Sequence, residues 1–267
     1  MNRRGLTVTL ALAGVWLSAG GSAASAASYA ESVQAILSSP PAGANYPEAV
    51  EASILNDLNK LRARKKLGIL GNRPALQQAA RAHSMRMLRD GFFAHEDPDG
   101  RDVGARIAAV DRTGLYRTVG ENLGKITPVI PDVAVRMHKG WVESKGHYAN
   151  MINKDFDRVG IGCAQDAKQT LCTQAFGGLA AQLADPLPLV FSRGQRVELQ
   201  PALQPLSYAG WHLVDFAGKK QSGGKTRQFQ PPKGLRGEFQ MEVLAEKRIS
   251  KIRSIIYQFF GPTVILE

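Results

Sequence analysis

Two histidines and one glutamate are the residues of this sequence best suited to chemistry. His95 follows a short apolar run just after Gly91, which ends a predicted helix, and His147 follows Gly146 at another predicted helix end. Glu121 lies midway between them in the chain. Two neutral imidazoles and a carboxylate can bind Zn²⁺ or a similar divalent ion and leave one position open for water. Their separations match no local metal motif, such as two histidines four residues apart on a helix, so a shared site depends on the fold.

The other three histidines give weaker signals. His83 lies on the apolar face of a predicted helix, which favours a hydrogen-bonded core histidine. His212 follows Trp211 in a predicted strand, and we interpret it as structural. His138 lies near Trp141 on another predicted helix, and the sequence indicates no partner for it.

Helices and one short apolar segment are predicted to position the three candidate residues. Apolar residues at helical spacing predict helices over residues 47–68 and 74–90, and shorter ones over about 102–110 and 131–144. Residues 119–124 are expected to be a strand or loop that enters the core. Glu121 would then come from the core, whereas both histidines would come from the ends of helices.

The N-terminus has the pattern of a secretory signal peptide. Arg3 and Arg4 precede an apolar stretch from Leu6 to Leu17, and Ala24-Ser25-Ala26 fits the small-residue pattern of a cleavage site. The apolar stretch is too short for a bilayer, which needs about 20 residues. We therefore expect residues 1–26 to be removed, no transmembrane segment to remain, and the protein to be secreted or periplasmic. Residues 27–45 are expected to be a linker.

The chain is basic, with 34 Lys and Arg against 23 Asp and Glu and a formal net charge of +11. An exported protein rarely meets genomic DNA, so we expect no nucleic-acid partner. The basic residues are spread along the chain, which is typical of a solvated surface. Attraction to anionic lipid headgroups or cell-wall polymers is the alternative, and composition does not choose between the two.

Both cysteines lie in one predicted hairpin. Runs of β-favouring residues at 159–164 and 171–176 flank a polar turn, which places Cys163 and Cys172 on opposite arms. In an oxidising compartment a disulfide is the favoured state and would contribute about 2–3 kcal/mol, and a free buried pair is the alternative. Two cysteines exclude a disulfide-dense scaffold and a Cys-rich zinc site.

The last eighty or so residues have a different pattern. Pro186 and Pro188 interrupt the chain, and helical periodicity fades beyond them. Four β-favouring runs follow, at residues 196–199, 210–216, 237–243 and 255–260. We interpret residues 188–267 as a small all-β, sandwich-like domain.

Five short motifs follow one another along the chain. They are Ala79-Ala80-Arg81-Ala82-His83-Ser84, Phe92-Phe93-Ala94-His95, Gly120-Glu121-Asn122-Leu123, the segment 141–152, and Phe156-Asp157-Arg158-Val159-Gly160-Ile161-Gly162. This set resembles the CAP superfamily, the relatives of cysteine-rich secretory proteins, antigen 5 and pathogenesis-related 1 proteins, in its secreted bacterial form. The order of the motifs is specific, whereas each alone is weak. The resemblance covers about residues 50–180 and implies an SCP-type α-β-α sandwich over residues 46–184. The expected fold class is therefore α+β, with the all-β domain following it.

The resemblance also implies a cleft with two histidines and two acidic residues. His95 and His147 match the two histidines, and Glu121 matches the first glutamate. The second glutamate of animal and plant members falls on Ser144 here, as it often does in bacterial members. Glu143 precedes it by one residue, about 100° around a helix, and need not face the cleft. The predicted cleft residues are thus His95, Glu121, Ser144 and His147, with His95, Glu121 and His147 as candidate metal ligands.

Three functions remain open from the sequence. The favoured one is a non-enzymatic binding protein whose cleft holds a lipid, sterol, envelope or protein ligand, with or without a divalent metal such as Zn²⁺. The alternative is a metal-assisted hydrolase of peptide or cell-wall bonds, in which a carboxylate acts as general base. A Ser144–His147 hydrolase is weaker, because no nucleophile-elbow motif surrounds Ser144. A purely structural polar cluster is the third.

Overall fold

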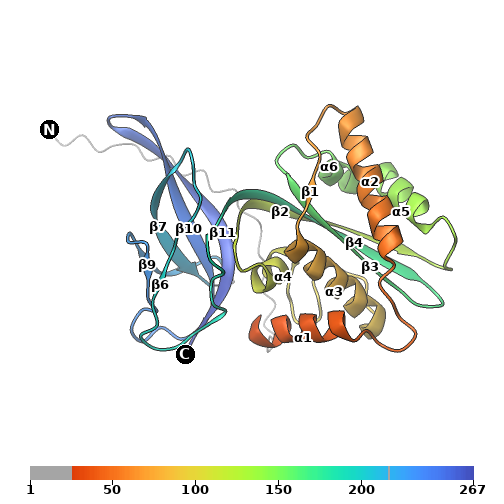
Figure 1. Cartoon of the computed structure of the whole chain (residues 1–267), viewed down its shortest axis with the longest axis horizontal. Helices are drawn as coiled ribbons and strands as arrows, with labels where there is room; N and C mark the ends of the chain where they lie inside the picture. Colours follow the sequence, from red (N-terminus) through yellow and green to blue (C-terminus); the bar gives the residue numbers. More distant parts are fainter. Residues whose placement is uncertain (1–25, 216) are drawn as a thin grey trace.

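A long mixed sheet runs through the molecule and joins its helical half to its all-β half (Figure 1). The computed structural model describes residues 26–215 and 217–267. The strand order is β1-β3-β4-β2-β11-β10-β7-β8, and β5 pairs with β11. The strands of this sheet are β1 (Gly71–Asn72), β2 (Gly114–Ile126), β3 (Arg158–Gln165), β4 (Thr170–Gln182), β5 (Val190–Phe191), β7 (Ser207–Val214), β8 (Lys220–Gly224), β10 (Gly237–Ser250) and β11 (Arg253–Leu266). A separate pair consists of β6 (Val197–Glu198) and β9 (Gln228–Phe229).

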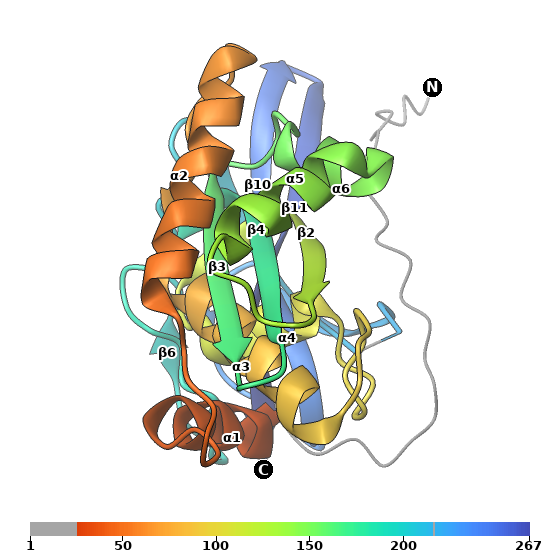
Figure 2. The same cartoon turned by 90° about the vertical axis from the view of Figure 1, so that its right-hand side faces the viewer.

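Helices cover both faces of the part of the sheet formed by β2, β3 and β4 (Figure 1). The helices are α1 (Ala26–Ser38), α2 (Glu48–Arg64), α3 (Pro74–Asp90), α4 (Val103–Val110), α5 (Val133–Glu143) and α6 (Lys145–Met151). Helices α2, α5 and α6 lie on one side, and α3 and α4 lie on the other, with α1 beside them at the end of that layer (Figure 2). The predicted α-β-α sandwich and the α+β class are confirmed.

Glycines in β3 explain why α3 lies so close to the sheet. A Cβ at Gly160 would lie 2.1 Å from the backbone nitrogen of Gln77, and one at Gly162 would lie 2.0 Å from that of Arg81. Real Cβ atoms do not approach backbone this closely, so only glycine fits. Side chains alternate across a strand, so Val159 and Ile161 face the opposite layer, where they pack in the core beneath α2, α5 and α6.

The predicted linker over residues 27–45 is wrong for most of its length, because residues 26–38 form helix α1. Tyr29, Val33 and Ile36 recur at helical spacing, are all buried, and pack in a cluster with residues of α3 and α4. The Ala- and Ser-rich composition and the prolines that follow concealed this periodicity. The predicted signal peptide lies outside the described residues apart from Ala26, where α1 begins.

The C-terminal region adds strands to the same sheet. All four predicted β-favouring runs fall on strands, namely β6, β7, β10 and β11. Strand β11 pairs antiparallel with β2, with Phe260 opposite Tyr116. Leu115 of β2 and Ala181 of β4 also belong to the apolar cluster that contains Trp211. The C-terminal strands therefore share part of their core with the helical half. In the described part of the chain, every helix is too short or too polar to span a membrane.

Candidate functional site

His95 and Glu121 meet, as the sequence analysis predicted. The ring Nδ1 of His95 donates a hydrogen bond to Glu121 Oε2 over 2.8 Å. The Glu121 side chain lies on β2 and is only 3% exposed, whereas the His95 side chain lies in the loop after α3 and is 61% exposed. The hydrogen bond that His95 donates to Glu121, followed by the negative charge of Glu121, raises the pKa of His95. The opposite ring nitrogen, Nε2, makes no hydrogen bond with the described residues and is available to a ligand.

Arg106, which the sequence analysis missed, completes a buried ion pair beneath His95. It lies on α4, its side chain is 1% exposed, and its Nη2 donates to Glu121 Oε1. Its Nη1 donates to the backbone oxygens of His95, over 2.7 Å, and of Arg101, over 2.6 Å. Burial alone would raise the pKa of Glu121, but the charge of Arg106 and the bond from His95 outweigh it, so that pKa is lowered. Glu121 is therefore ionised, and the positive charge of Arg106 neutralises its negative charge.

The loop that carries His95 is held by buried charges. Asp97 is buried, and its Oδ1 accepts hydrogen bonds from the backbone nitrogens of Asp99 and Arg101. Its Oδ2 accepts one from Arg86 Nη1 of α3 over 2.6 Å. The ring of Tyr29 lies against Arg101, whose guanidinium carbon is 4.9 Å from the ring centre. Helix α1 thus packs against the loop that presents His95.

His83 supports the same loop from inside the core. It is fully buried, as predicted for a core histidine, and its Nε2 donates to the backbone oxygen of Ala94 over 3.0 Å. Its ring meets that of Phe92 edge-on, with centres 5.7 Å apart. Burial, aided by the charge of Arg106, lowers the pKa of His83 to about 3. The ring is therefore neutral, and it holds the backbone of Ala94, the residue that precedes His95.

A network of amides holds the backbone of His147 beside β2. Asn122, beside Glu121 on β2, donates from Nδ2 to the backbone oxygen of His147 over 3.0 Å and to Gln174 Oε1 over 2.9 Å. Asn150 donates to the backbone oxygen of Glu121 over 3.1 Å and to Asn122 Oδ1 over 2.9 Å. Helix α6 is thereby fastened to β2. Partial burial lowers the pKa of His147, and the charge of His95 lowers it further.

Ser144 occupies the junction of two helices. It lies between α5 and α6, where its backbone oxygen accepts a hydrogen bond from Tyr148 N over 2.8 Å. Within the described ranges, its hydroxyl forms no hydrogen bond with His95, Glu121 or His147. The structure also brings together no three His, Cys, Asp or Glu residues that could hold a metal ion, as judged over the described part of the chain. The proposed metal ligands His95, Glu121 and His147 therefore do not form a ready-made metal centre. Each oxygen of Glu121 accepts a hydrogen bond, one from Arg106 and the other from His95.

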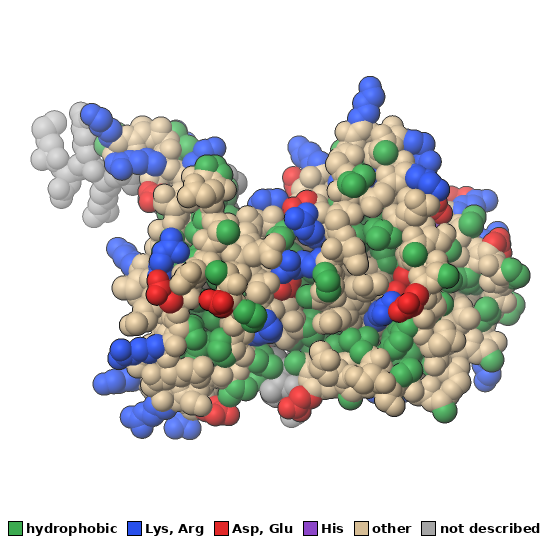
Figure 3. All heavy atoms as spheres, viewed as in Figure 1, with side chains coloured by type: hydrophobic (Ala, Val, Ile, Leu, Met, Phe, Trp, Pro, Cys, Tyr) green, Lys and Arg blue, Asp and Glu red, His purple; other side chains and the backbone are tan. Residues whose placement is uncertain are grey.

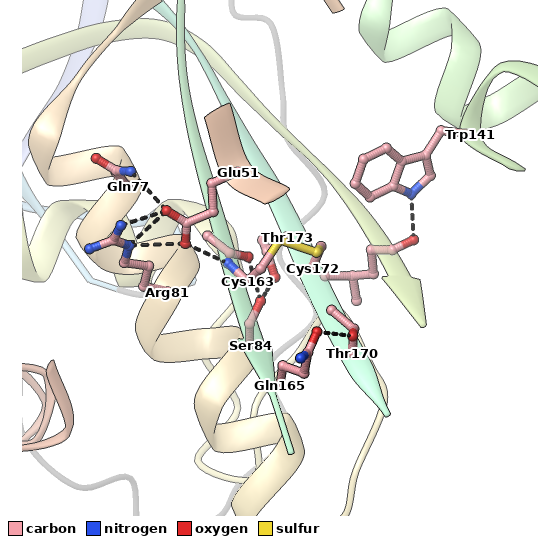
Figure 4. The surroundings of a disulfide bond; sticks show 12 residues. Glu51, Gln77, Arg81, Ser84, Trp141, Cys163, Gln165, Thr170, Cys172 and Thr173 are labelled. Atoms are coloured by element: carbon pink, nitrogen blue, oxygen red, sulfur yellow. Dashed lines mark hydrogen bonds and ion pairs between the residues drawn. A yellow bond between two sulfur atoms is a disulfide. The ribbon is translucent and has the colours of Figure 1, made fainter. Parts of the chain in front are cut away.

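The cysteines form the predicted disulfide, which joins β3 to β4. Cys163 of β3 and Cys172 of β4 are opposite each other and are bonded. Figure 4 shows the surroundings, in which Glu51 of α2 accepts hydrogen bonds from the Cys163 backbone nitrogen, over 2.9 Å, and from Arg81 of α3. Ser84 donates to the backbone oxygen of Gly162 over 2.8 Å. The disulfide and this polar cluster tie both helical layers to the sheet.

Residues 55–176 match the family described as the cysteine-rich secretory protein family, or CAP. We call this matched segment the CAP domain. His95, Glu121, Ser144 and His147 all lie inside it, whereas the C-terminal strands β5–β11 lie outside. The uncharacterized protein YkwD of Bacillus subtilis (strain 168) is 29% identical over 131 residues, which are 49% of this chain and 48% of that protein. The match thus spans about half the length of this relative.

Solved structures similar to the CAP domain come from several organisms. An extracellular protein containing an SCP domain from Bacillus anthracis str. Ames is 26% identical, with a TM-score of 0.42 over 49% of this chain and 40% of that one. An outer surface protein from Borrelia burgdorferi is 18% identical, with a TM-score of 0.44 over 49% of this chain and 93% of that one.

Arg106, Asn122 and Asn150 are the site residues that sequence reasoning did not assign. A signal for Arg106 was present, because it is a lone charge in the apolar helix Val103–Val110. A charge on a buried helical face needs a partner, and Glu121 in its predicted core segment was a candidate. The two asparagines lay in motifs already singled out, but nothing in their spacing indicated that they contact each other.

Proposed function

We propose that this chain is an exported binding protein whose CAP domain holds an anionic group, such as a phosphate or carboxylate of a lipid or envelope polymer, at His95 and His147. The observation that carries the proposal is the buried Arg106–Glu121 pair. Because Arg106 neutralises Glu121, the charge of the site is set by the two imidazoles alone, and it is zero or positive. When the imidazoles are protonated, this site favours anions over metal ions.

The orientation of His95 supports binding through Nε2. Its Nδ1 proton is committed to Glu121, so the exposed Nε2 gains a proton when the ring is charged and then donates to a ligand oxygen. Glu121 raises the pKa of His95, which extends the charged state to higher pH. Affinity for an anion should therefore be greatest below the pKa of His95 in the folded protein and should fall as pH rises through it.

The metal-assisted hydrolase draws no comparable support. Its general base would be Glu121, but both oxygens of that carboxylate are occupied, one by His95 and one by Arg106. Ser144, the position of the second acid in other members, supplies no carboxylate. We therefore place binding ahead of hydrolysis.

Calorimetric and NMR titrations with glycerol phosphate and with Zn²⁺ test the proposal. We expect glycerol phosphate to shift the ring signals of His95 and His147 saturably at low pH, and His95→Gln to abolish the effect. His212→Gln is the matched control, because His212 also has a carboxylate nearby, with Nδ1 3.8 Å from Glu242 Oε2. Stoichiometric Zn²⁺ binding that His95→Gln or His147→Gln removes would overturn the proposal in favour of a metal site. An absence of any saturable phosphate response would also overturn it.

A further inference from the structure

The long β10–β11 hairpin ends in a tip whose composition is unusual for a solvated turn. We define the tip as residues 247–253, of sequence Lys-Arg-Ile-Ser-Lys-Ile-Arg. Ser250 pairs with Arg253, so Lys251 and Ile252 form the two-residue loop. Such loops favour Gly, Asn and Asp, whose backbones adopt the tight turn readily. Isoleucine at this position therefore does not serve the turn itself.

The two isoleucines of the tip face solvent. Ile252 is 86% exposed and Ile249 is 47% exposed. Ile249 lies at the irregularity between Arg248 and Ser250, where the strand pairing shifts. Behind the tip, β10 and β11 remain paired, with Lys247 opposite Ile255 and Ala245 opposite Tyr257. The apolar side chains thus lie at the end of a hydrogen-bonded hairpin. Because the paired strands already fix their position, no flexible loop has to become ordered before they meet a partner.

Positive charge surrounds the isoleucines. Lys247, Arg248, Lys251 and Arg253 belong to the tip, which contains no acidic residue. Figure 3 shows Lys and Arg side chains gathered at this end of the all-β half, which projects beyond the body of the molecule. Arg248 reaches back to the backbone oxygen of Lys251, over 3.3 Å. In the described residues, Lys247, Lys251 and Arg253 form no ion pair, so their charges are available to a partner.

We propose that the hairpin tip docks on an anionic lipid bilayer, with Ile249 and Ile252 inserted at the boundary between headgroups and acyl chains. Exposed apolar side chains ringed by cations fit a bilayer surface, because the cations lie at the level of the phosphates while the apolar groups leave water. A soluble polyanion would use the cations but would gain little from the isoleucines. This chemistry distinguishes a bilayer from a polymer.

Co-sedimentation of the exported protein with vesicles tests the docking. We expect binding to vesicles of phosphatidylglycerol and phosphatidylcholine, and little binding to phosphatidylcholine alone. Ile249→Ser with Ile252→Ser should lower the partition constant by about tenfold per isoleucine. Lys247→Gln with Lys251→Gln should lower it by about fivefold per charge. The matched control is Ile69→Ser, since Ile69 is 70% exposed in the other half of the molecule.

Each outcome decides the proposal. Loss of binding in the isoleucine variant but not in Ile69→Ser supports it, provided that circular dichroism shows both variants folded. Binding that depends on the lysines but not on the isoleucines would show a polyanion contact and overturn insertion. Equal loss in Ile69→Ser, or no binding by the wild-type protein, would overturn docking altogether. The variant Ile249→Ser with Ile252→Ser should keep the wild-type NMR response of His95 to glycerol phosphate, which separates this proposal from anion binding in the CAP domain.

Discussion

Removing the charge of Glu121 should destabilise the CAP domain more than most single substitutions do. In Glu121→Gln, the Arg106 guanidinium stays buried, at 1% exposure of its side chain, without its counter-ion. Breaking a buried ion pair from one side costs about 3–5 kcal/mol, because a buried charge is left uncompensated. The double variant Arg106→Met with Glu121→Gln buries no such charge, so we expect it to be more stable than Glu121→Gln alone. Urea unfolding followed by circular dichroism measures both free energies of unfolding.

A second measurement on Glu121→Gln separates electrostatics from a general packing defect. The hydrogen bond to Glu121 is the largest cause of the raised pKa of His95, so the NMR titration of His95 should move to lower pH in the variant. The titration of His212, on β7, should not move. Three results would each refute the reasoning. They are a loss of stability below about 1 kcal/mol in Glu121→Gln, a double variant less stable than Glu121→Gln, and an unchanged titration of His95.

Two further predictions concern the core around the site. His83 has its pKa lowered from 6.5 to about 3; below pH 6.5 the unfolded chain therefore binds a proton that the folded one does not, and stability falls as pH falls. Down to about pH 5 this lowers the free energy of unfolding by about 2 kcal/mol. Because Gln stays neutral, the free energy of unfolding of His83→Gln should depend less steeply on pH, as measured by urea unfolding at several pH values. The same pH dependence in the variant and the wild type would contradict the lowered pKa of His83. Cys163→Ala with Cys172→Ala opens a loop of sequence separation 9 and should lower the free energy of unfolding by about 3 kcal/mol. Reducing the wild type with dithiothreitol should cause the same loss. If it does not, the disulfide bond is not the cause of the lower stability.

The elements that follow local rules were predictable. Helix α3 begins at Pro74 and ends before Gly91, whose φ of 74° suits a glycine at a helix end, and the expected bounds 74–90 are those observed. The hairpin with both cysteines was likewise visible from two β-favouring runs and a polar turn. Helix α1 was missed for a local reason as well, since its small residues and the following prolines resemble a linker in composition, although its apolar spacing is helical.

The candidate site was only partly predictable. The meeting of His95 and Glu121 was foreseen through the family resemblance, because nothing in their spacing indicates contact. The residue types also suggested metal ligation by two imidazoles and one carboxylate, in which Glu121 would use a free oxygen. Arg106 already occupies one oxygen of Glu121. This contact exists because Arg106 is buried against β2, and no local sequence pattern indicates that burial.

Periodicity, glycines and paired cysteines by themselves determined the layers of this protein, because each acts over a few residues of chain. Alternation in β3 sets glycine toward α3 and apolar side chains toward α2, and that choice is already present in the order of the residues. Only the tertiary structure decided the charge of the site. Charges from α4, β2 and the loop after α3 interact strongly once water is excluded from between them, and that exclusion exists only in the folded chain.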